Sequence, residues 1–329
     1  MKKFFLLAPM AELSHRALRE LIESFGGCDE YFTEMISAGA FAAGGPFEAW
    51  YADNGPCPGK TVYQLGGRDA GQIARAAALL SERECLGIDI NMGCSAPAIT
   101  RTGAGVRWME SIDKAGNLAA LTRKAVKRRL SVKLRTGPGD DFDYLVRFCR
   151  RLEEEGVELI TLHPRTAREK FRRQAKWSYV PALKKELRIK VAGNGDISSA
   201  AEMLDRSALC DAVMTGRLAV KQPWCFSEAR TLETRNSGGY DSRGYNVEET
   251  GLRFLELLCR YQPPEFHLSR ARRFFSYFCG SLTWAHYLTT LLNREQGLAG
   301  MERVWRGYFA EHPEEINIPR RKQRGMLFL

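Results

Sequence analysis

The segment GIDINMGCSAPAITRTGAGVRWMESIDKAGNLAALTRKAVKRRLSVKLRT, residues 87–136, decides the architecture of this chain. It contains two short apolar runs, GIDIN (87–91) and SVKLRT (131–136), and between them a helical pattern, KAGNLAALTRKAV (114–126). Runs of this length are typical of strands, and a strand, a helix and a second strand in succession join two parallel neighbours. The segment therefore predicts one β–α–β crossover.

The same alternation extends over most of the chain. The strand candidates are residues 4–9, 31–36, 61–65, 87–91, 131–136, 159–163, 189–193 and 211–215. Eight parallel strands close either as an open doubly wound sheet or as a (β/α)8 barrel, and the count of eight over about 250 residues favours the barrel. The first helix is expected to have Ser14 as its N-cap and to stop at Gly26-Gly27.

The alternation ends at TRNSGGYDSRGYN (234–246), whose Gly, Ser, Asn and Asp content is typical of a linker. Only helical patterns follow, and no strand-like run. We expect an α/β protein with a catalytic (β/α)8 TIM barrel over 1–235, a linker over 236–245 and a small all-helical domain over 246–329.

Composition narrows the function classes. The 329 residues are 44% hydrophobic and 27% charged, which fits a folded protein, and no apolar stretch is long enough to span a membrane. Nine cysteines without C-x-x-C spacing predict reduced thiols, no metal and a cytoplasmic location. The start MKKFFLLAPMAE mimics a signal peptide but fits a first buried strand better. The net charge of +10 favours polyanionic partners, and we expect a monomer.

Polar residues and glycines follow nearly every predicted strand. They are Pro9, Met10, Ala11, Gln64, Asn91, Cys94, Lys133, Arg135, His163, Asn194, Gly195, Asp196, Gly216 and Arg217. In (β/α) barrels this end carries the active site, and the loops after the last two strands commonly bind phosphate. Glycine backbone, a helix N-terminus and a guanidinium together predict a phosphate-bearing cofactor.

Each of these clusters also has a simpler interpretation. The glycines fit ordinary turns, His163 fits a structural histidine, and Cys94 fits one more buried thiol. Lys133 fits a solvated surface less well, because strand alternation puts Val132 and Leu134 on the opposite face. In a barrel, Lys133 then points into the lumen, where an uncompensated ammonium is unfavourable.

Six ordered motifs resemble the tRNA-dihydrouridine synthase family. They are LAPM (7–10), DINMGCSAPAITRTGAG (89–105), VKLRTG (132–137), LHPRTAREKFRRQAKW (162–177), VAGNGDI (191–197) and AVMTGRLAVKQPWCF (212–226). Their order and spacing match the family over about residues 5–227. One departure is Ser95, where the family usually has proline.

The resemblance implies an enzyme that reduces the C5–C6 double bond of a tRNA uridine to 5,6-dihydrouridine, with FMN as cofactor and NADPH as reductant. Cys94 would donate the proton to C5. Free thiols have an ordinary pKa of about 8.5, which suits a general acid at pH 7. The residues that would bind FMN are Pro9, Met10, Ala11, Gln64, Lys133, His163, Asn194, Gly195, Asp196, Gly216 and Arg217.

A basic stretch supplies the expected surface for RNA. Residues 123–190 contain 20 Lys and Arg against 9 Asp and Glu, and residues 165–177 contain six against one. Charge runs are usually solvated faces, but this one follows the sixth strand, so it lies beside the predicted site. The expected tRNA contacts are Asn91, Arg135, Arg165, Arg168, Lys170, Arg172, Arg173, Arg270 and Arg272.

Two other functions compete with this interpretation. One is another FMN-dependent barrel oxidoreductase acting on a small molecule, similar to dihydroorotate dehydrogenase, which would need neither the basic stretch nor the helical domain. The other is a catalytically silent flavin barrel that only binds tRNA. The presence of Cys94 and Lys133 disfavours the silent form.

Overall fold

The computed structural model describes residues 2–169, 172–234 and 244–318. The chain forms two compact units, residues 1–233 and 234–329. Lys170 and residues 236–243 of the expected linker lie outside the described residues.

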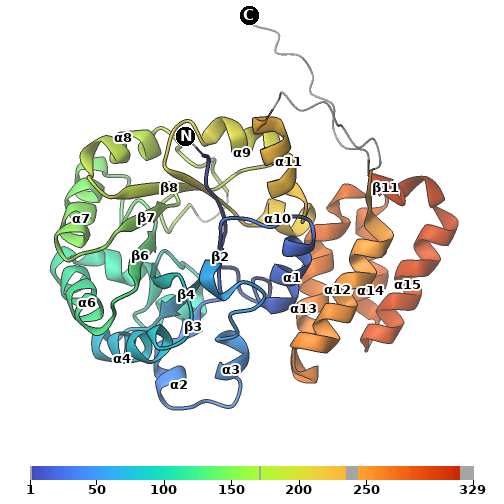
Figure 1. Ribbon diagram of the computed structural model, residues 1–329, viewed down its shortest axis with the longest axis horizontal. Helices are drawn as coiled ribbons and strands as arrows, with labels where there is room; N and C mark the ends of the chain where they lie inside the picture. Colours follow the sequence, from blue (N-terminus) through green and yellow to red (C-terminus); the bar gives the residue numbers. More distant parts are fainter. Residues whose placement is uncertain (1, 170–171, 235–243, 319–329) are drawn as a thin grey trace, which may run out of the picture. The chain divides into compact units, whose positions relative to one another are not determined.

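The first unit is a closed parallel barrel, as predicted (Figure 1). Its eight strands are β1 (Phe5–Leu7), β2 (Glu30–Phe32), β4 (Thr61–Gly66), β5 (Gly87–Met92), β6 (Arg129–Leu134), β7 (Leu159–Leu162), β8 (Lys190–Asn194) and β9 (Ala212–Thr215). The ring closes because β2 pairs with both β1 and β4, and a short extra strand, β3 (Ile36–Ser37), pairs with the end of β4. Each predicted apolar run supplies one barrel strand.

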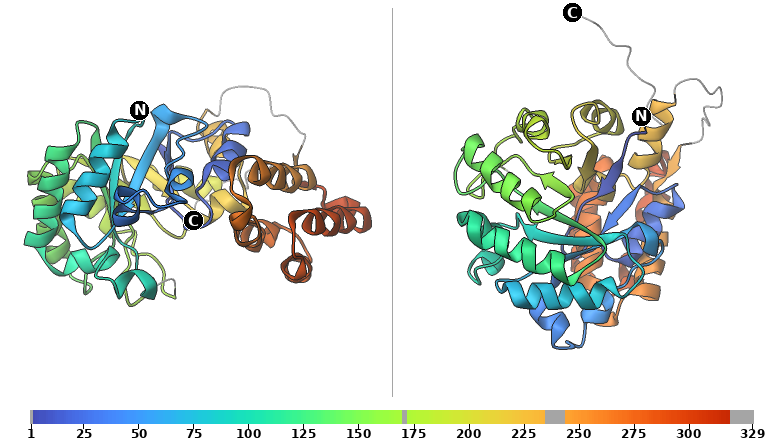
Figure 2. Two further views of the ribbon diagram at one scale, coloured as in Figure 1. Left: turned by 90° about the horizontal axis from the view of Figure 1, so that it is seen from below. Right: turned by 60° about the vertical axis from the view of Figure 1, so that its left-hand side comes forward.

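Helices lie outside the strands of this unit, as Figure 2 shows from two further sides. The longer ones are α1 (Arg16–Ser24), α4 (Ala70–Ser81), α6 (Ile112–Ala125), α7 (Phe142–Glu154), α8 (Tyr179–Glu186), α9 (Ala200–Arg206) and α11 (Cys225–Glu233). Shorter ones are α2 (Ala38–Ala42), α3 (Glu48–Tyr51), α5 (Pro97–Thr100), α10 (Arg217–Lys221) and the 3-10 turns Pro58–Lys60 and Gly105–Glu110.

The start of α1 differs from the expectation, and its end agrees with it. The N-cap residue is His15, whose side chain makes no capping hydrogen bond. Ser14 is not the cap, and its hydroxyl accepts a hydrogen bond from the Met10 amide at 2.9 Å. Ser14 therefore stabilises the turn after β1. At the other end, Gly26 and Gly27 have φ of +102° and +67°, and the Gly27 amide donates to the Ile22 carbonyl.

Strand register determines which side chains fill the barrel. The inward set on β1, β2, β4 and β9 includes the buried residues Leu6, Phe32, Val62 and Met214, which form one apolar cluster. Further along β4, and on β5 and β6, the inward residues Gln64, Asp89 and Ser131 are polar, and they are register neighbours. The barrel interior is thus apolar on one side and hydrogen-bonded on the other.

The second unit contains the helices α12 (Val247–Tyr261), α13 (Pro264–Phe278), α14 (Ala285–Arg294) and α15 (Leu298–Glu311), with 3-10 turns at Cys279–Ser281 and Pro313–Glu315. Buried aromatic side chains form its core, and the rings of Phe254 and Phe274 stack with centroids 3.6 Å apart. The expectation of no strands here was wrong. Tyr245–Asn246 (β10) and Asn317–Ile318 (β11) pair in an antiparallel ribbon that is too short to show a sequence period. No helix among the described residues is long and apolar enough to cross a membrane.

Candidate active site at the carboxyl end of the barrel

The residues predicted for catalysis and for cofactor binding lie at or near the carboxyl ends of the barrel strands. Asn91 and Lys133 are register neighbours on β5 and β6, one step beyond Asp89 and Ser131 on the same inward face. Gly216 follows β9 and lies against Met10, since a Cβ added there would be 2.9 Å from the Met10 sulfur. Pro9 and Met10 are partly buried and Ala11 is exposed.

Backbone contacts on two sides hold the Cys94 loop. The Asn91 Oδ1 accepts hydrogen bonds from the amides of Gly93 and Cys94 at 3.2 and 2.9 Å, and the Val106 amide donates to the Cys94 carbonyl at 3.0 Å. Gly105 has φ of +64°, and a Cβ there would lie 2.4 Å from the same carbonyl oxygen. Only glycine fits this position, which explains the Gly-x-Gly downstream of the cysteine.

Lys133 is charged but weakened as a cation. Burial, and after it the neighbouring Arg135 guanidinium, lowers the pKa of this ammonium to about 8, although Asp89 and Cys94 act in the opposite direction. Most Lys133 side chains are therefore protonated at pH 7. A positive charge is thus held inside the barrel close to Cys94.

His163 is neutral. It is 7% exposed, and the Arg165 guanidinium lies 3.0 Å from its Nε2. Because arginine can only donate, Nε2 is the acceptor and the ring proton is on Nδ1. Burial, followed by the charges of Lys133, Arg135, Arg165 and Arg217, lowers the pKa of His163 to about 2.

The loop after β8 is fastened to the loop after β7. The Asp196 carboxylate accepts hydrogen bonds from Arg165 at 2.5 Å and from the Ala175 amide at 2.8 Å, and it pairs with Arg217 at 3.3 Å. Burial alone would raise the pKa of Asp196, but these three groups hold it below its usual value. Backbone φ is positive at both Gly195 (+119°) and Asp196 (+54°).

Gly195 also makes close contacts. A Cβ on it would lie 2.8 Å from the His163 ring, and its carbonyl accepts a hydrogen bond from Trp177 Nε1 at 2.8 Å. Asn194 donates to the Met214 carbonyl at 2.8 Å, which ties the end of β8 to β9. The predicted phosphate-binding glycines are thus fixed in a cationic surrounding.

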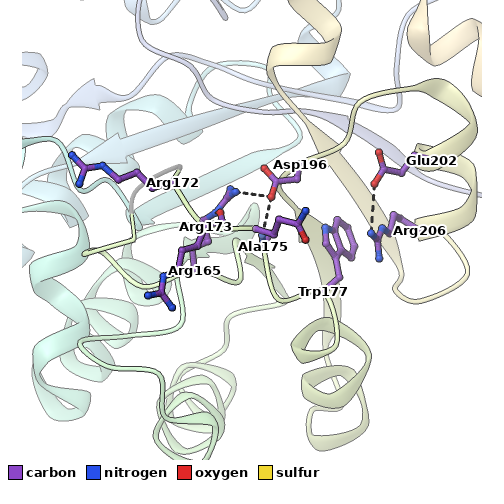
Figure 3. A pocket seen from close by; sticks show the side chains of 9 residues that line it. Arg165, Arg172, Arg173, Ala175, Trp177, Asp196, Glu202 and Arg206 are labelled. Carbon is purple, nitrogen blue, oxygen red and sulfur yellow. Dashed lines mark hydrogen bonds and ion pairs between the residues drawn. The ribbon is translucent and has the colours of Figure 1, made fainter.

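A pocket of about 370 Å³ opens between the loop after β7 and the helix α9 (Figure 3). Arg206 stacks over the Trp177 ring at 4.8 Å and pairs with Glu202 at 3.5 Å, whereas Arg172 and Arg173 are exposed. The lining residues are Arg165, Arg172, Arg173, Gln174, Ala175, Trp177, Asp196, Glu202 and Arg206. Four arginines against two acids make this pocket suited to an anion.

The nine residues expected to contact tRNA differ in their exposure. Arg168, Arg172 and Arg173 are exposed. Asn91, Arg135, Arg165 and Arg270 are at most 8% exposed, and their polar groups bond to other parts of the chain. Arg272 is partly buried and donates to the Glu295 carbonyl at 2.8 Å, and Lys170 is outside the described residues.

The buried arginines are structural in this conformation. Arg135 donates to the carbonyls of Gly93 and Thr166 at 2.9 and 3.1 Å, and burial lowers the pKa of its guanidinium. Arg270 lies over the Phe266 ring at 4.5 Å. Because these groups are buried, a tRNA phosphate does not reach them without a rearrangement. The sequence shows where the charges are but not which of them are buried.

Sequence reasoning missed Asp89 and Ser131. Asp89 has no exposed surface, and its carboxylate accepts hydrogen bonds from Ser131 and Gln64. Burial raises the pKa of Asp89 to about 6. The available signal was an acidic residue at the centre of the apolar run GIDIN. Gln64, expected at the cofactor, is 1% exposed and bonds to both Asp89 and Asn91.

Comparisons with known proteins show which family this chain resembles. The family model for dihydrouridine synthase (Dus) matches residues 6–272. A probable tRNA-dihydrouridine synthase of Aquifex aeolicus is 32% identical over 75% of this chain and 79% of its own. The tRNA-dihydrouridine synthase B of Pectobacterium carotovorum is 30% identical over 68% of this chain and 70% of its own. Histamine dehydrogenase from Rhizobium sp. 4-9 resembles 70% of this chain, and 45% of its own, with a TM-score of 0.52 and 12% identity, a likeness of fold alone.

Proposed function

The chain belongs to the dihydrouridine synthase family, and from this membership we propose that it reduces a uridine of tRNA to 5,6-dihydrouridine, with FMN as cofactor and NADPH as reductant. The observation that carries the proposal is the combination at one end of the barrel of a fixed Cys94 loop, a half-buried ammonium on Lys133 and a neutral His163. The substrate and reductant occur in the cytoplasm, where we expect the protein to act.

The residues present fit a bound FMN. Its phosphate requires hydrogen-bond donors and positive charge, which the glycine backbone after β8 and β9 and the Arg217 guanidinium provide. His163 would donate from Nδ1, and Met10, Asn194 and Lys133 would complete the binding site. The Lys133 charge favours an electron-rich flavin ring. When bound, FMN would supply the hydride that adds to C6 of uracil.

Cys94 would hold the proton that C5 then requires. Its loop leaves the thiol half-buried. Of the other eight cysteines, six are buried, Cys57 is half-buried and Cys259 is exposed. A thiol is acidic enough to give up its proton and is protonated often enough at pH 7 to carry one. The backbone contacts around Cys94 would fix the face from which this proton arrives.

The exposed arginines after β7 would guide the RNA. Arg168, Arg172 and Arg173 lie beside the site on a loop that Asp196 and Trp177 hold in place. Guanidinium groups at this position suit phosphates on either side of a uridine turned out of its stack. Residues 246–329 would form the tRNA-recognition domain. A barrel oxidoreductase for a small molecule has no need of these exposed charges.

The test is to map dihydrouridine in tRNA from cells with and without this chain. We expect one or more uridines to lose the modification in the deletion strain. Purified yellow protein with NADPH should restore it to that tRNA in vitro. A colourless folded protein that FMN cannot reconstitute, or an unchanged dihydrouridine map, would contradict the proposal.

A further inference from the structure

A continuous series of hydrogen bonds inside the barrel begins at a fully buried carboxylate. Asp89 on β5 lies between Gln64 on β4 and Ser131 on β6, its two register neighbours. The Ser131 hydroxyl donates to Asp89 Oδ1 at 2.6 Å, and Gln64 Nε2 donates to Oδ2 at 2.8 Å. Both carboxylate oxygens are therefore bonded, and Asp89 has no exposed surface.

The series continues upward to the loop that carries Cys94. The Asn91 Nδ2 donates to Gln64 Oε1 at 2.8 Å, and Asn91 Oδ1 accepts from the Cys94 amide at 2.9 Å. Two side-chain amides thus connect the carboxylate to the backbone of the proposed proton donor.

The carboxylate fixes the direction of every bond in the series. An ionised carboxylate can only accept, so Gln64 must turn its NH2 group toward Asp89 and its oxygen toward Asn91. Asn91 must then turn its NH2 group toward Gln64, which leaves its oxygen for the loop amides. Turning either amide over would bring two donors or two acceptors together in a buried site.

We propose that Asp89 is a positioning residue, which orients Gln64 and Asn91 so that the Asn91 oxygen holds the Cys94 loop. The proposal rests on the proposed function, in which Cys94 donates a proton to the substrate. Asp89 itself touches neither substrate nor cofactor in this role.

The chemistry of the site also requires an explanation for an acid at this position. Burial raises the pKa of Asp89 to about 6, although Ser131, Gln64, Lys133 and Arg129 all act to lower it. Burying this charge is unfavourable, and an apolar side chain would fill a barrel interior more favourably. A role in orienting the amides accounts for a carboxylate here, whereas simple filling of the barrel does not.

The test uses Asp89→Val, which keeps a branched side chain suited to a strand but removes both acceptors. Without the carboxylate, Gln64 and Asn91 are no longer held in one orientation, so the Asn91 oxygen protects the Gly93 and Cys94 amides less. We expect the hydrogen exchange of these two amides to speed up by about tenfold or more. Reoxidation of the reduced flavoprotein by tRNA should slow by at least about tenfold, with tRNA affinity unchanged. Exchange is read by mass spectrometry and reoxidation by anaerobic single-turnover absorbance.

Two further variants separate positioning from general stability. Asp89→Asn retains an acceptor for Gln64, so both readouts should return to within about threefold of wild type. Ser131→Ala removes the other partner of the carboxylate and leaves the path to Cys94 intact, so it should lower stability without changing exchange at Cys94. If Asp89→Val does not fold, Gln64→Met cuts the same path and must show the same loss of protection.

Several results would overturn the proposal. The first is unchanged exchange at Cys94 in Asp89→Val or, if that variant does not fold, in Gln64→Met. The second is an Asp89→Asn variant as impaired as Asp89→Val. The third is a Ser131→Ala variant that loses as much protection at Cys94 as Asp89→Val. Exchange is measured without tRNA, so a wild-type protein that fails to modify tRNA would refute the proposed function and leave this test readable.

Discussion

At the scale of single residues, the site concentrates positive charge in a small volume. Lys133, Arg135 and Arg165 lie close enough that each lowers the pKa of a neighbour, and His163 is kept neutral beside them. Asp196 is the acid that pairs with Arg165 and Arg217. Like charges held together repel one another, so an anion that binds among them gains their combined attraction.

Replacing Cys94 should separate the reaction into two halves. Reduction by NADPH requires no acid at uracil C5, so Cys94→Ala should be reduced at close to the normal rate. Reoxidation by tRNA should slow by about 10²–10⁴-fold, the usual contribution of a positioned general acid. Anaerobic single-turnover absorbance measures both steps. Cys94→Ser should be nearly as slow, and Cys259→Ala, which removes an exposed thiol on α12, is the matched control. A normal reoxidation rate in Cys94→Ala would exclude the thiol from the chemistry.

Lys133 predicts a pH dependence of stability. Its folded pKa is about 8 against an ordinary 10.5. Below pH 8 both the folded and the unfolded chain hold the proton, so the full penalty of burying the ammonium is present. Between pH 8 and 10.5 only the unfolded chain holds it, so the contribution of Lys133 to the free energy of unfolding rises with pH.

Flavin-free Lys133→Met should therefore be more stable than wild type at pH 7, by up to about 3 kcal/mol. The difference should shrink as the pH approaches 10.5. Urea unfolding at pH 7, 8.5 and 10 measures it, and Lys114→Met, an exposed lysine on α6, controls for loss of a surface charge. A constant or growing difference would mean that Lys133 is not buried as an ammonium.

At the scale of elements, the strands were predictable, whereas the loops that would carry the proposed function were so only in part. The eight apolar runs sufficed for the barrel because a parallel strand buried on both faces leaves a continuous hydrophobic segment. Alternation also placed Lys133 on the inward face. Burial could not be predicted, since the letters RTAREKFRR do not distinguish Arg165, which bonds to Asp196, from Arg172, which is exposed. Asp89 was missed for the same reason, because its partners come from other strands.

The exposed part of the loop after β7 gives the prediction at this scale. Replacing Arg168, Arg172 and Arg173 together with alanine should weaken tRNA binding and reduce the slope of log affinity against log salt by up to about 2–3. Flavin content and reduction by NADPH should stay normal. Filter binding at several salt concentrations measures the slope.

A matched control for this triple variant lies at the other end of the barrel. Lys127, Arg128 and Arg188 are exposed and precede β6 and β8, so they sit away from the carboxyl ends of the strands. Their replacement removes the same charge but should leave most of the tRNA affinity. Equal losses in the two variants would show that only net charge matters.

At the scale of the whole molecule, the chain has two compact units, one an α/β barrel and the other mainly helical. The first, residues 1–233, contains every residue of the proposed FMN site and Cys94. The second is helical with its own aromatic core, in which Trp305 contacts Phe275 and Phe278. Each unit buries its own hydrophobic side chains, which is the property expected of separable domains.

This division predicts separable activities. A chain that ends at Glu233 should fold, bind FMN and be reduced by NADPH at close to the normal rate, because no residue proposed for those steps lies beyond that point. Its affinity for tRNA should fall at least about tenfold, since the unit proposed to recognise tRNA, with its positively charged surface, is lost. Flavin absorbance, stopped-flow reduction and filter binding measure the three properties. The full-length triple variant of Arg168, Arg172 and Arg173 is the comparison, because it should lose affinity through the barrel alone. If the truncated chain modified the same uridines at the wild-type rate, tRNA recognition would reside in the barrel, and the helical unit would have another role.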